Sequence, residues 1–215
     1  MMILKTLLAA CLAVGALVFT GPALAQEAPD VLVKRITREV MATAKSDREI
    51  KAGNRKRIHE VVETMILPHL DFRRATAMTL GRYWRQATPQ QQQQLIDEFR
   101  ALMMYTYAGA MSQIGDQELE YKPLRAGPDD TEVEVHFQVR QTRGSEPVQV
   151  AYRLYKTPDG WKVYDVNVMG AWLIETYKNS FSTEIDKGGI DGLIRTLSEK
   201  NRKLAAQANG SGRRP

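Results

Sequence analysis

The chain has 215 residues, 43% of them hydrophobic, with 30 lysines and arginines against 25 aspartates and glutamates. This length and composition favour one globular domain and exclude a largely disordered chain, while nine prolines and 15 glycines exclude a collagen-like or low-complexity architecture. After residue 25 no apolar run is long enough to cross a membrane, so we expect a soluble protein.

The first 25 residues have the pattern of a cleaved signal peptide. Lys5 supplies the positive charge, residues 6–20 are almost entirely apolar, and Ala23-Leu24-Ala25 matches a signal-peptidase site. The alternatives are an uncleaved membrane anchor and a lipoprotein signal ending at Cys11, but the apolar stretch is short for either. We therefore predict an exported protein, free in its compartment, whose mature chain starts at Gln26. Because Lys5 is the one charged side chain removed, the formal net charge falls from +5 to +4.

The first half of the mature chain has the spacing of amphipathic helices. Apolar residues recurring every three or four positions predict helices over residues 29–45, 54–67, 72–80 and 89–114. Gly81 is a typical helix C-cap for the third of these. Thr88 and Gln91 flank Pro89 in the pattern of a capping box, which is the clearest start signal in the chain.

After residue 116 the apolar period changes to two. Strands are predicted over residues 118–122, 133–140, 148–154 and 161–168, with a tight turn at residues 157–160. A helix is then predicted from Gly170, another after Gly188-Gly189, and a disordered polar tail over 206–215. The order of elements predicts an α+β fold, with a four-stranded antiparallel sheet packed by several helices, in one domain over residues 26–205.

The search for catalytic motifs finds no nucleophile elbow, zinc-protease motif, phosphate-binding glycine loop or dinucleotide fingerprint. His59, His69 and His136 lie on different predicted elements without metal-ligand spacing. Asp165 and Asn167 could act as a general base and a polarising group in a cavity. Hydrogen bonding to neighbouring loops is the simpler interpretation, so we expect no enzyme, no metal and no cofactor. A small cavity enzyme that uses Asp165 remains the alternative.

Methionine and aromatic residues are frequent on the long helix and along the sheet. Methionine packs adaptably and tyrosine combines an apolar ring with a polar tip, so together they suit a cavity for a flexible apolar ligand. An ordinary core has the same composition, and composition alone does not decide between them.

Four ordered segments carry a resemblance to a known family. They are Leu-Gly-Arg-Tyr-Trp-Arg-Gln-Ala-Thr-Pro at 80–89, Phe-Arg at 99–100, Gly-Trp-Lys-Val-Tyr-Asp-Val at 160–166 followed by Gly170, and Gly-Gly-Ile-Asp-Gly-Leu-Ile at 188–194. Together they resemble the MlaC, or toluene-tolerance, family of periplasmic phospholipid-binding proteins, and the similarity extends over about residues 30–200. Many members have a glutamate where this chain has Met169 and a small residue where it has Trp172, which bears on the rim of the pocket.

The resemblance implies a carrier that shuttles glycerophospholipids between the inner and outer membranes and maintains outer-membrane lipid asymmetry. It implies two partners: an ATP-driven (ABC) inner-membrane transporter with an MCE-domain subunit, and an outer-membrane lipoprotein complex. It also implies an apolar cavity between sheet and helices that holds phospholipid as cargo. Strand alternation leaves open which sheet face points inward. The residues predicted to contact the acyl chains are Met103, Tyr107, Val150, Tyr152, Tyr164, Val166 and Trp172.

A basic cluster lies around the first two predicted helices: Lys45, Arg48, Lys51, Arg55, Lys56 and Arg57. Export argues against a nucleic-acid partner, and no aromatic residues interleave with the cluster as a base-stacking surface requires. We predict that it docks an acidic partner surface or anionic head groups. A merely solvated helical face is an equal alternative, and a periplasmic chaperone-like module is the other non-enzymatic interpretation of the chain.

Overall fold

A computed structural model describes residues 26–127, 129–140 and 146–210. The predicted signal peptide and Cys11 lie outside these residues. The helical half of the fold comprises α1 (Pro29–Ser46), α2 (Arg48–Lys51), α3 (Arg55–Val61), the π-helix η1 (Val62–Ile66), the 3-10 helix η2 (Leu67–His69), α4 (Phe72–Leu80), η3 (Gly81–Gln86), α5 (Pro89–Tyr107) and η4 (Ala108–Gln113). The second half comprises β1 (Glu118–Tyr121), β2 (Glu132–Arg140), β3 (Val148–Thr157), β4 (Gly160–Val168), β5 (Ala171–Trp172) and α6 (Leu173–Gly210).

The predicted α+β class is confirmed, but the sheet has five strands rather than four. All neighbours are antiparallel, in the order β1-β2-β3-β4-β5. The added strand begins after a tight turn in which Met169 and Gly170 both have positive φ, 52° and 89°. It pairs Ala171 with Val168 and Trp172 with Asn167. A two-residue strand is too short for alternation to reveal, so Trp172 lies in the sheet and not in the predicted helix.

The start of α5 agrees with its sequence signal. The Thr88 hydroxyl accepts the backbone N–H of Gln91 at 3.2 Å, and the Gln91 side chain accepts the backbone N–H of Thr88 at 2.9 Å. The helix ends at Tyr107, earlier than predicted, and continues as η4. Gly109 favours this change because glycine lowers helix propensity, and helices commonly tighten to 3-10 geometry at their C-terminus.

The helix predicted over residues 54–67 is broken into α3, η1 and η2. Pro68 explains the end of regular helix, because its ring clashes with the preceding turn and it has no N–H to donate. A short helix, α2, was not predicted. It is capped by Asp47, whose carboxylate accepts the backbone N–H groups of Glu49 and Ile50 at 2.9 and 3.2 Å.

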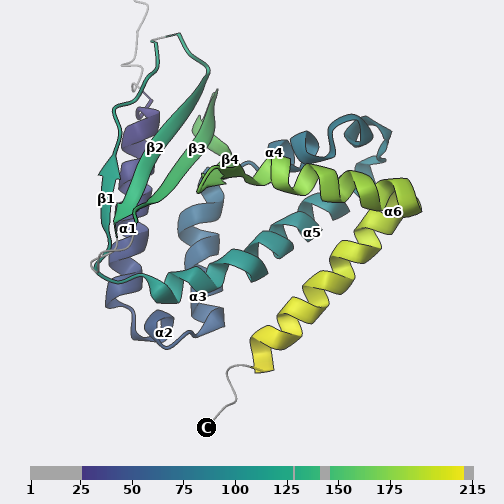
Figure 1. Ribbon diagram of the computed structural model, residues 1–215, viewed down its shortest axis with the longest axis horizontal. Coiled ribbons are helices and arrows are strands. Elements are labelled where there is room, and N and C mark those ends of the chain that lie inside the picture. Colours follow the sequence, from purple (N-terminus) through teal and green to yellow (C-terminus); the bar gives the residue numbers. More distant parts are fainter. Residues whose placement is uncertain (1–25, 128, 141–145, 211–215) are drawn as a thin grey trace, which may run out of the picture.

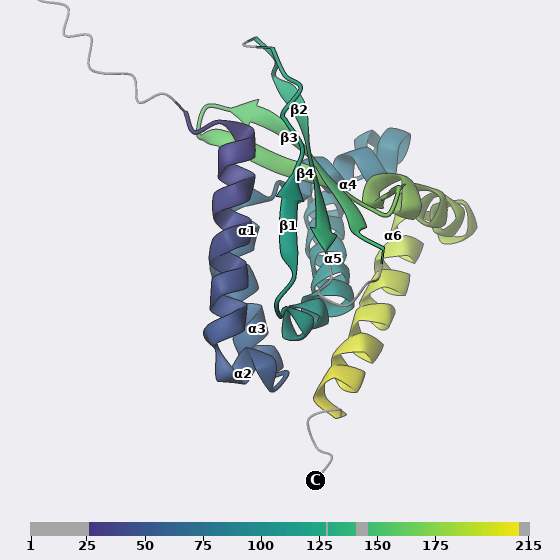
Figure 2. The ribbon, with the colours of Figure 1, turned by 60° about the vertical axis from the view of Figure 1, so that its left-hand side comes forward.

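One face of the sheet is covered by α1, which lies alongside β1 and β2 in both ribbon views (Figures 1 and 2). Leu32 and Val33 of α1 pack against Val135, Phe137 and Leu154 in one apolar cluster. A second cluster joins α5 to α6, and a third joins α1 to α2, α3 and η4.

The last helix, α6, consists of two segments that meet at Gly189, where φ is 68° and ψ is −173°. The two halves run in different directions, as the lime and yellow segments of Figure 1 show. They correspond to the two predicted C-terminal helices. The second half continues to Gly210, past residue 206, where we expected the disordered tail to begin. None of the helices in the described part of the chain combines the length and apolar character that a membrane crossing requires.

Candidate functional site

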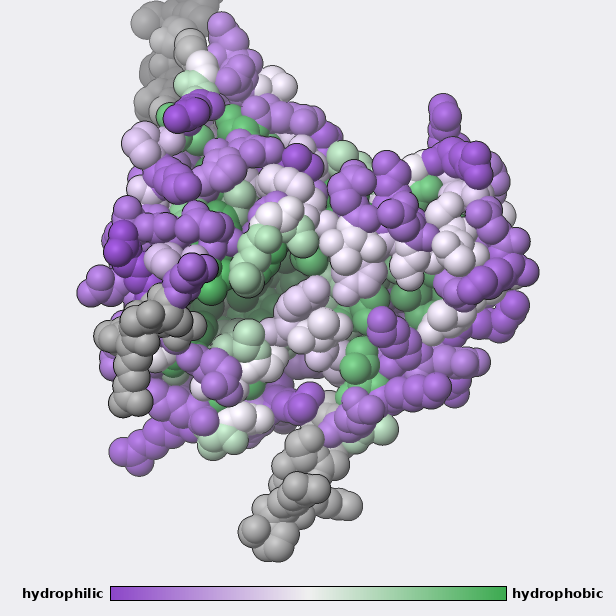
Figure 3. All heavy atoms as spheres, in the orientation of Figure 1, coloured by the Kyte–Doolittle hydropathy of each residue, from purple (hydrophilic) through white to green (hydrophobic). Residues whose placement is uncertain are grey.

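A cavity of about 330 Å³ lies between β4 and the helices. Its volume is at the lower end of the range of roughly 300–1,000 Å³ for ligand pockets. In the space-filling view, hydrophobic residues form the floor of a hollow near the middle of one face (Figure 3). The lining comes from three stretches of chain: Val62, Ile66, Leu67, Leu70, Asp71, Phe72 and Ala75; Phe99, Met103, Met104, Tyr107, Ala108 and Met111; and Val163, Tyr164, Asp165, Val166, Val168, Leu173 and Ile174.

The first wall, from η1 to α4, is fastened to β4. The backbone N–H of Asp71 donates to the carbonyl of Val163 at 2.8 Å, and the Lys162 ammonium donates to the carbonyl of Pro68 at 2.6 Å. The carboxylate of Asp71 then caps α4 by accepting the backbone N–H of Arg74 at 2.8 Å. These bonds place the apolar side chains of Leu67 and Phe72 over the cavity.

The second wall is the C-terminal half of α5 with η4. Phe99 contacts the rings of Tyr177 and Phe181 edge-on, each at 5.3 Å between centroids, so it joins the cavity to the core between α5 and α6. Tyr107 lies nearer the surface and is 46% exposed. Burial raises the pKa of Tyr177, and interaction with the Tyr107 side chain raises it further. This wall therefore runs from a packed interior to an open mouth.

The third wall depends on an irregularity in β4. Val163 pairs with Leu154 and Asp165 pairs with Arg153, so Tyr164 is an extra residue with no partner across the ladder. Such a bulge re-aims neighbouring side chains. As a result four consecutive residues, 163–166, contact the cavity, which strict alternation does not allow.

The two carboxylates in the lining are both engaged in the fold. One oxygen of Asp165 accepts the backbone N–H groups of Val166 and Ile174 at 2.9 and 3.1 Å, and the other lies 3.4 Å from the Arg153 guanidinium. Burial raises the pKa of Asp165, and these hydrogen bonds and Arg153 partly oppose that rise. The carboxylate of Asp71 accepts the hydroxyl of Tyr155.

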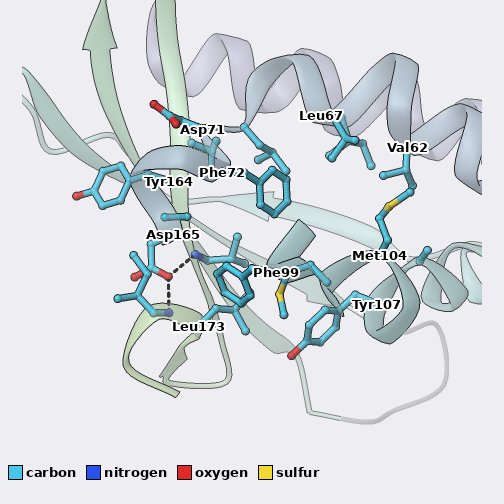
Figure 4. Close-up of a pocket in the computed structure, with 18 of the residues that line it drawn as sticks. Val62, Leu67, Asp71, Phe72, Phe99, Met104, Tyr107, Tyr164, Asp165 and Leu173 are labelled. Carbon is cyan, nitrogen blue, oxygen red and sulfur yellow. Dashed lines mark hydrogen bonds between the residues drawn. The ribbon is translucent and has the colours of Figure 1, made fainter. Parts of the chain in front are cut away.

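Figure 4 shows how the lining side chains are directed. Phe72 and Leu67 face Phe99 and Met104, whereas the polar ends of Asp71 and Tyr164 point away from this apolar group. The cavity is therefore suited to an apolar ligand.

Asp165 and Asn167 are the candidate general base and polarising group. Both side chains accept hydrogen bonds from backbone groups of the fold. The Asn167 side chain accepts the backbone N–H of Gly170 at 2.9 Å, and the Asp165 carboxylate holds the start of α6. Both contacts support a role in the β4–α6 connection. The described residues bring no three histidine, cysteine, aspartate or glutamate side chains together as a metal site requires.

Four of the seven residues predicted to contact a ligand line this cavity: Met103, Tyr107, Tyr164 and Val166. Val150 and Tyr152 are not among the lining residues. Tyr152 pairs directly with Val166 and Val150 with Val168, so they share the cavity's sheet face, but they lie one strand away in the cluster covered by α1. Trp172 also lies outside the lining, and the centre of its ring is 3.7 Å from the Arg153 guanidinium.

Seven of the 16 lining residues that were missed lie in the stretch 62–75, from η1 to α4. Val62 and Ile66 lie in the π-helix, and Leu67, Leu70 and Phe72 follow within a few residues. Phe72 and Ala75 have the three-residue spacing of a helix face, which is the one sequence signal that could have located part of this wall. The remaining positions depend on the irregular helix geometry that Pro68 imposes.

The basic cluster lies on the end of α1, on α2 and on α3, and none of its six residues lines the cavity. Arg48, Lys51, Arg55 and Lys56 are exposed. Arg57 pairs with Asp47 at 2.7 Å and with Glu60 at 3.2 Å, so acidic residues balance the charge of this member of the cluster.

Comparison with known proteins gives consistent results. The family model described as MlaC protein matches residues 34–199. A solved phospholipid-binding protein from Ralstonia solanacearum, in complex with a phospholipid, is 46% identical to this chain and has a TM-score of 0.78. The match covers 82% of this chain and 98% of that one.

Two curated relatives match over most of their length. The intermembrane phospholipid transport system binding protein MlaC of Haemophilus influenzae is 21% identical over 186 residues, which is 86% of this chain and 87% of the relative. The toluene tolerance protein ttg2D of Pseudomonas putida is 26% identical over 170 residues, 78% of this chain and 77% of the relative.

Proposed function

The chain belongs to the MlaC family, and from this membership and its apolar cavity we propose that it carries glycerophospholipids between the inner and outer membranes. In doing so it maintains the lipid asymmetry of the outer membrane. The observation that carries the proposal is the lining, in which both carboxylates are tied into the fold and the remaining side chains present apolar surface. The phospholipid bound to the Ralstonia solanacearum relative supports the same cargo class.

The energetics explain why such a carrier is needed. A sixteen-carbon acyl chain exposed to water costs roughly 12 kcal/mol, at about 0.8 kcal/mol per methylene. Free diffusion of a phospholipid across an aqueous compartment is therefore negligible. A cavity about as apolar as a bilayer makes transfer into and out of the protein nearly neutral, so partner proteins supply the direction of transport.

The proposed compartment is the periplasm, reached through the signal peptide that precedes Gln26. The proposed partners are an ATP-driven inner-membrane transporter with an MCE-domain subunit and an outer-membrane lipoprotein complex. The exposed cations of α2 and α3 support docking to such partners, because they lie outside the cavity and remain available while cargo is bound.

The test blocks the cavity without altering its charge. Ala75 of α4 lines the cavity, whereas Ala77 on the same helix does not. We expect native mass spectrometry of protein purified from Gram-negative cells to find phospholipid on the unmodified chain and on Ala77→Phe, but much less on Ala75→Phe. Circular dichroism would verify that both variants are folded. Purified unmodified protein without phospholipid, or Ala75→Phe loaded as fully as Ala77→Phe, would contradict the proposal.

A further inference from the structure

The turn between β4 and β5 exposes an apolar surface beside the mouth of the cavity. Its four consecutive residues, Val168, Met169, Gly170 and Ala171, are all exposed, and none has a polar side chain. Met169 is 75% exposed and Val168 is 41% exposed. Runs of exposed apolar residues are disfavoured in proteins that only need to remain dissolved, so such a run indicates a function.

The backbone of this turn has an unfavourable conformation for its sequence. Met169 has a φ of 52°, which bulky side chains rarely adopt and which asparagine, aspartate and glycine tolerate better. Strain of this kind persists where the surroundings over-determine it. Here the Met169 N–H donates to the carbonyl of Gln149 at 2.9 Å, and the Gly170 N–H donates to the Asn167 side chain at 2.9 Å. These two hydrogen bonds fix the backbone of the turn and keep the Met169 side chain exposed.

The exposed surface is continuous with the cavity. Val168 and Tyr107 both line the cavity and are more than 40% exposed, so apolar surface extends from the interior to the turn. Tyr107 adds an aromatic ring with a polar hydroxyl, a combination suited to the boundary between water and hydrocarbon.

The chemistry of the turn favours a lipid surface over a protein partner. A stable protein interface buries about 800 Å² per partner, far more than a four-residue turn offers. Protein partners are also commonly selected by charge complementarity, and residues 166–174 contain no charged side chain. Shallow insertion of a few apolar side chains at a bilayer surface requires neither.

We propose that the β4–β5 turn inserts into the interface of a phospholipid bilayer and places the cavity mouth against it. This inference rests on the proposed function, and it assigns to the turn the step at which cargo leaves or enters the cavity. Contact of this kind is weak, which suits a carrier that must leave the membrane again. A lipid that moves between bilayer and cavity along Val168 and Tyr107 avoids exposing its chains to water.

The experiment is vesicle flotation of the chain from residue 26, with vesicles of phosphatidylcholine and, separately, of phosphatidylethanolamine with phosphatidylglycerol. Met169→Asn removes the apolar tip and relieves the left-handed strain, so the fold is retained. Met78→Gln is the matched control, because Met78 is 40% exposed on α4 and lies outside the cavity lining. We expect about tenfold weaker vesicle association for Met169→Asn and no change for Met78→Gln.

Three results would overturn the inference: no association of the unmodified chain with either vesicle, equal association of Met169→Asn, or an equal loss in Met78→Gln. A Met169→Asn variant that binds vesicles normally but no longer binds a partner protein would assign the turn to that protein instead. Phospholipid content is measured in the same samples. If phospholipid is bound but vesicle association does not depend on Met169, the inference is contradicted and the proposed function is not. If no phospholipid is bound, the proposed function is contradicted.

Discussion

Ile174 donates its backbone N–H to the buried carboxylate of Asp165 at 3.1 Å, which fastens β4 to the first turn of α6. The same oxygen accepts the N–H of Val166, and the other oxygen faces Arg153. The two chain segments that form the third wall of the cavity, 163–168 and 173–174, are therefore held together by one side chain.

Asp165 gives the stability of the protein a defined pH dependence. Burial raises its pKa in the folded state above the ordinary value of 3.8. At pH values between the ordinary pKa and the raised pKa, the folded protein binds the proton more tightly than the unfolded chain does. The contribution of Asp165 to stability therefore falls as pH rises from the ordinary pKa to the raised one. Asp165→Asn lacks this titration. Its unfolding free energy relative to the unmodified protein should therefore improve as pH rises from 3.8 through the raised pKa.

Urea unfolding at a series of pH values measures this difference. Asp97→Asn, on the exposed face of α5, controls for the loss of one carboxylate. A difference between Asp165→Asn and the unmodified protein that does not change with pH would show that burial of Asp165 has no effect on its titration in the folded state.

The sequence predicts the regular helices and strands of the fold, but it predicts fewer of the residues that line the cavity. The capping box at Thr88 and the alternation of β2 and β3 are local signals, so α5 and the antiparallel sheet follow from them. β5 is too short for alternation to reveal, and the π-helix η1 depends on irregular helix geometry, so neither element has a clear signal in the sequence. Alternation placed Tyr152 and Val166 on the same sheet face, but it carries no information about which strand the cavity lies against.

A charge in the cavity lining should remove the cargo. Val166→Glu places a carboxylate against apolar side chains, at a cost of several kcal/mol when it is buried without a partner. We expect loss of phospholipid that co-purifies with the protein, with retained circular dichroism. Val148→Glu, a half-buried position on the neighbouring strand outside the lining, is the control and should keep its lipid. Equal lipid content in the two variants would argue against contact between Val166 and the acyl chains.

The side chain of Tyr107, at the mouth of the cavity, interacts with that of Tyr177 on α6 and helps to raise the pKa of Tyr177. Tyr177→Phe and Tyr107→Phe each remove one hydroxyl and should each lower the unfolding free energy by about 1 kcal/mol. Because both changes remove the same interaction between hydroxyls, the double variant should lose less than the two single losses added together. Urea unfolding of the four proteins tests this, and fully additive losses would show that the two hydroxyls do not interact.

Reversing exposed charges on α3 should slow docking. Arg55→Glu with Lys56→Glu should reduce the association rate with the MCE-domain subunit of the proposed inner-membrane transporter, most strongly at low salt, where charges are least screened. Lipid content should not change, since neither residue lines the cavity. Lys200→Glu with Arg202→Glu makes the same charge change on the exposed surface of α6. Stopped-flow rates that fall equally in both double variants would reveal only a net-charge effect.

The three walls of the cavity come from residues 62–75, 99–111 and 163–174, which are far apart in the chain. Contacts of such long sequence separation form late, because the intervening loops must close first. During synthesis from the N-terminus, the cavity stays open on one side until the last wall has been added. The proposed cargo therefore has a finished cavity to enter only after folding is complete, and a chain that lacks α6 has no finished cavity.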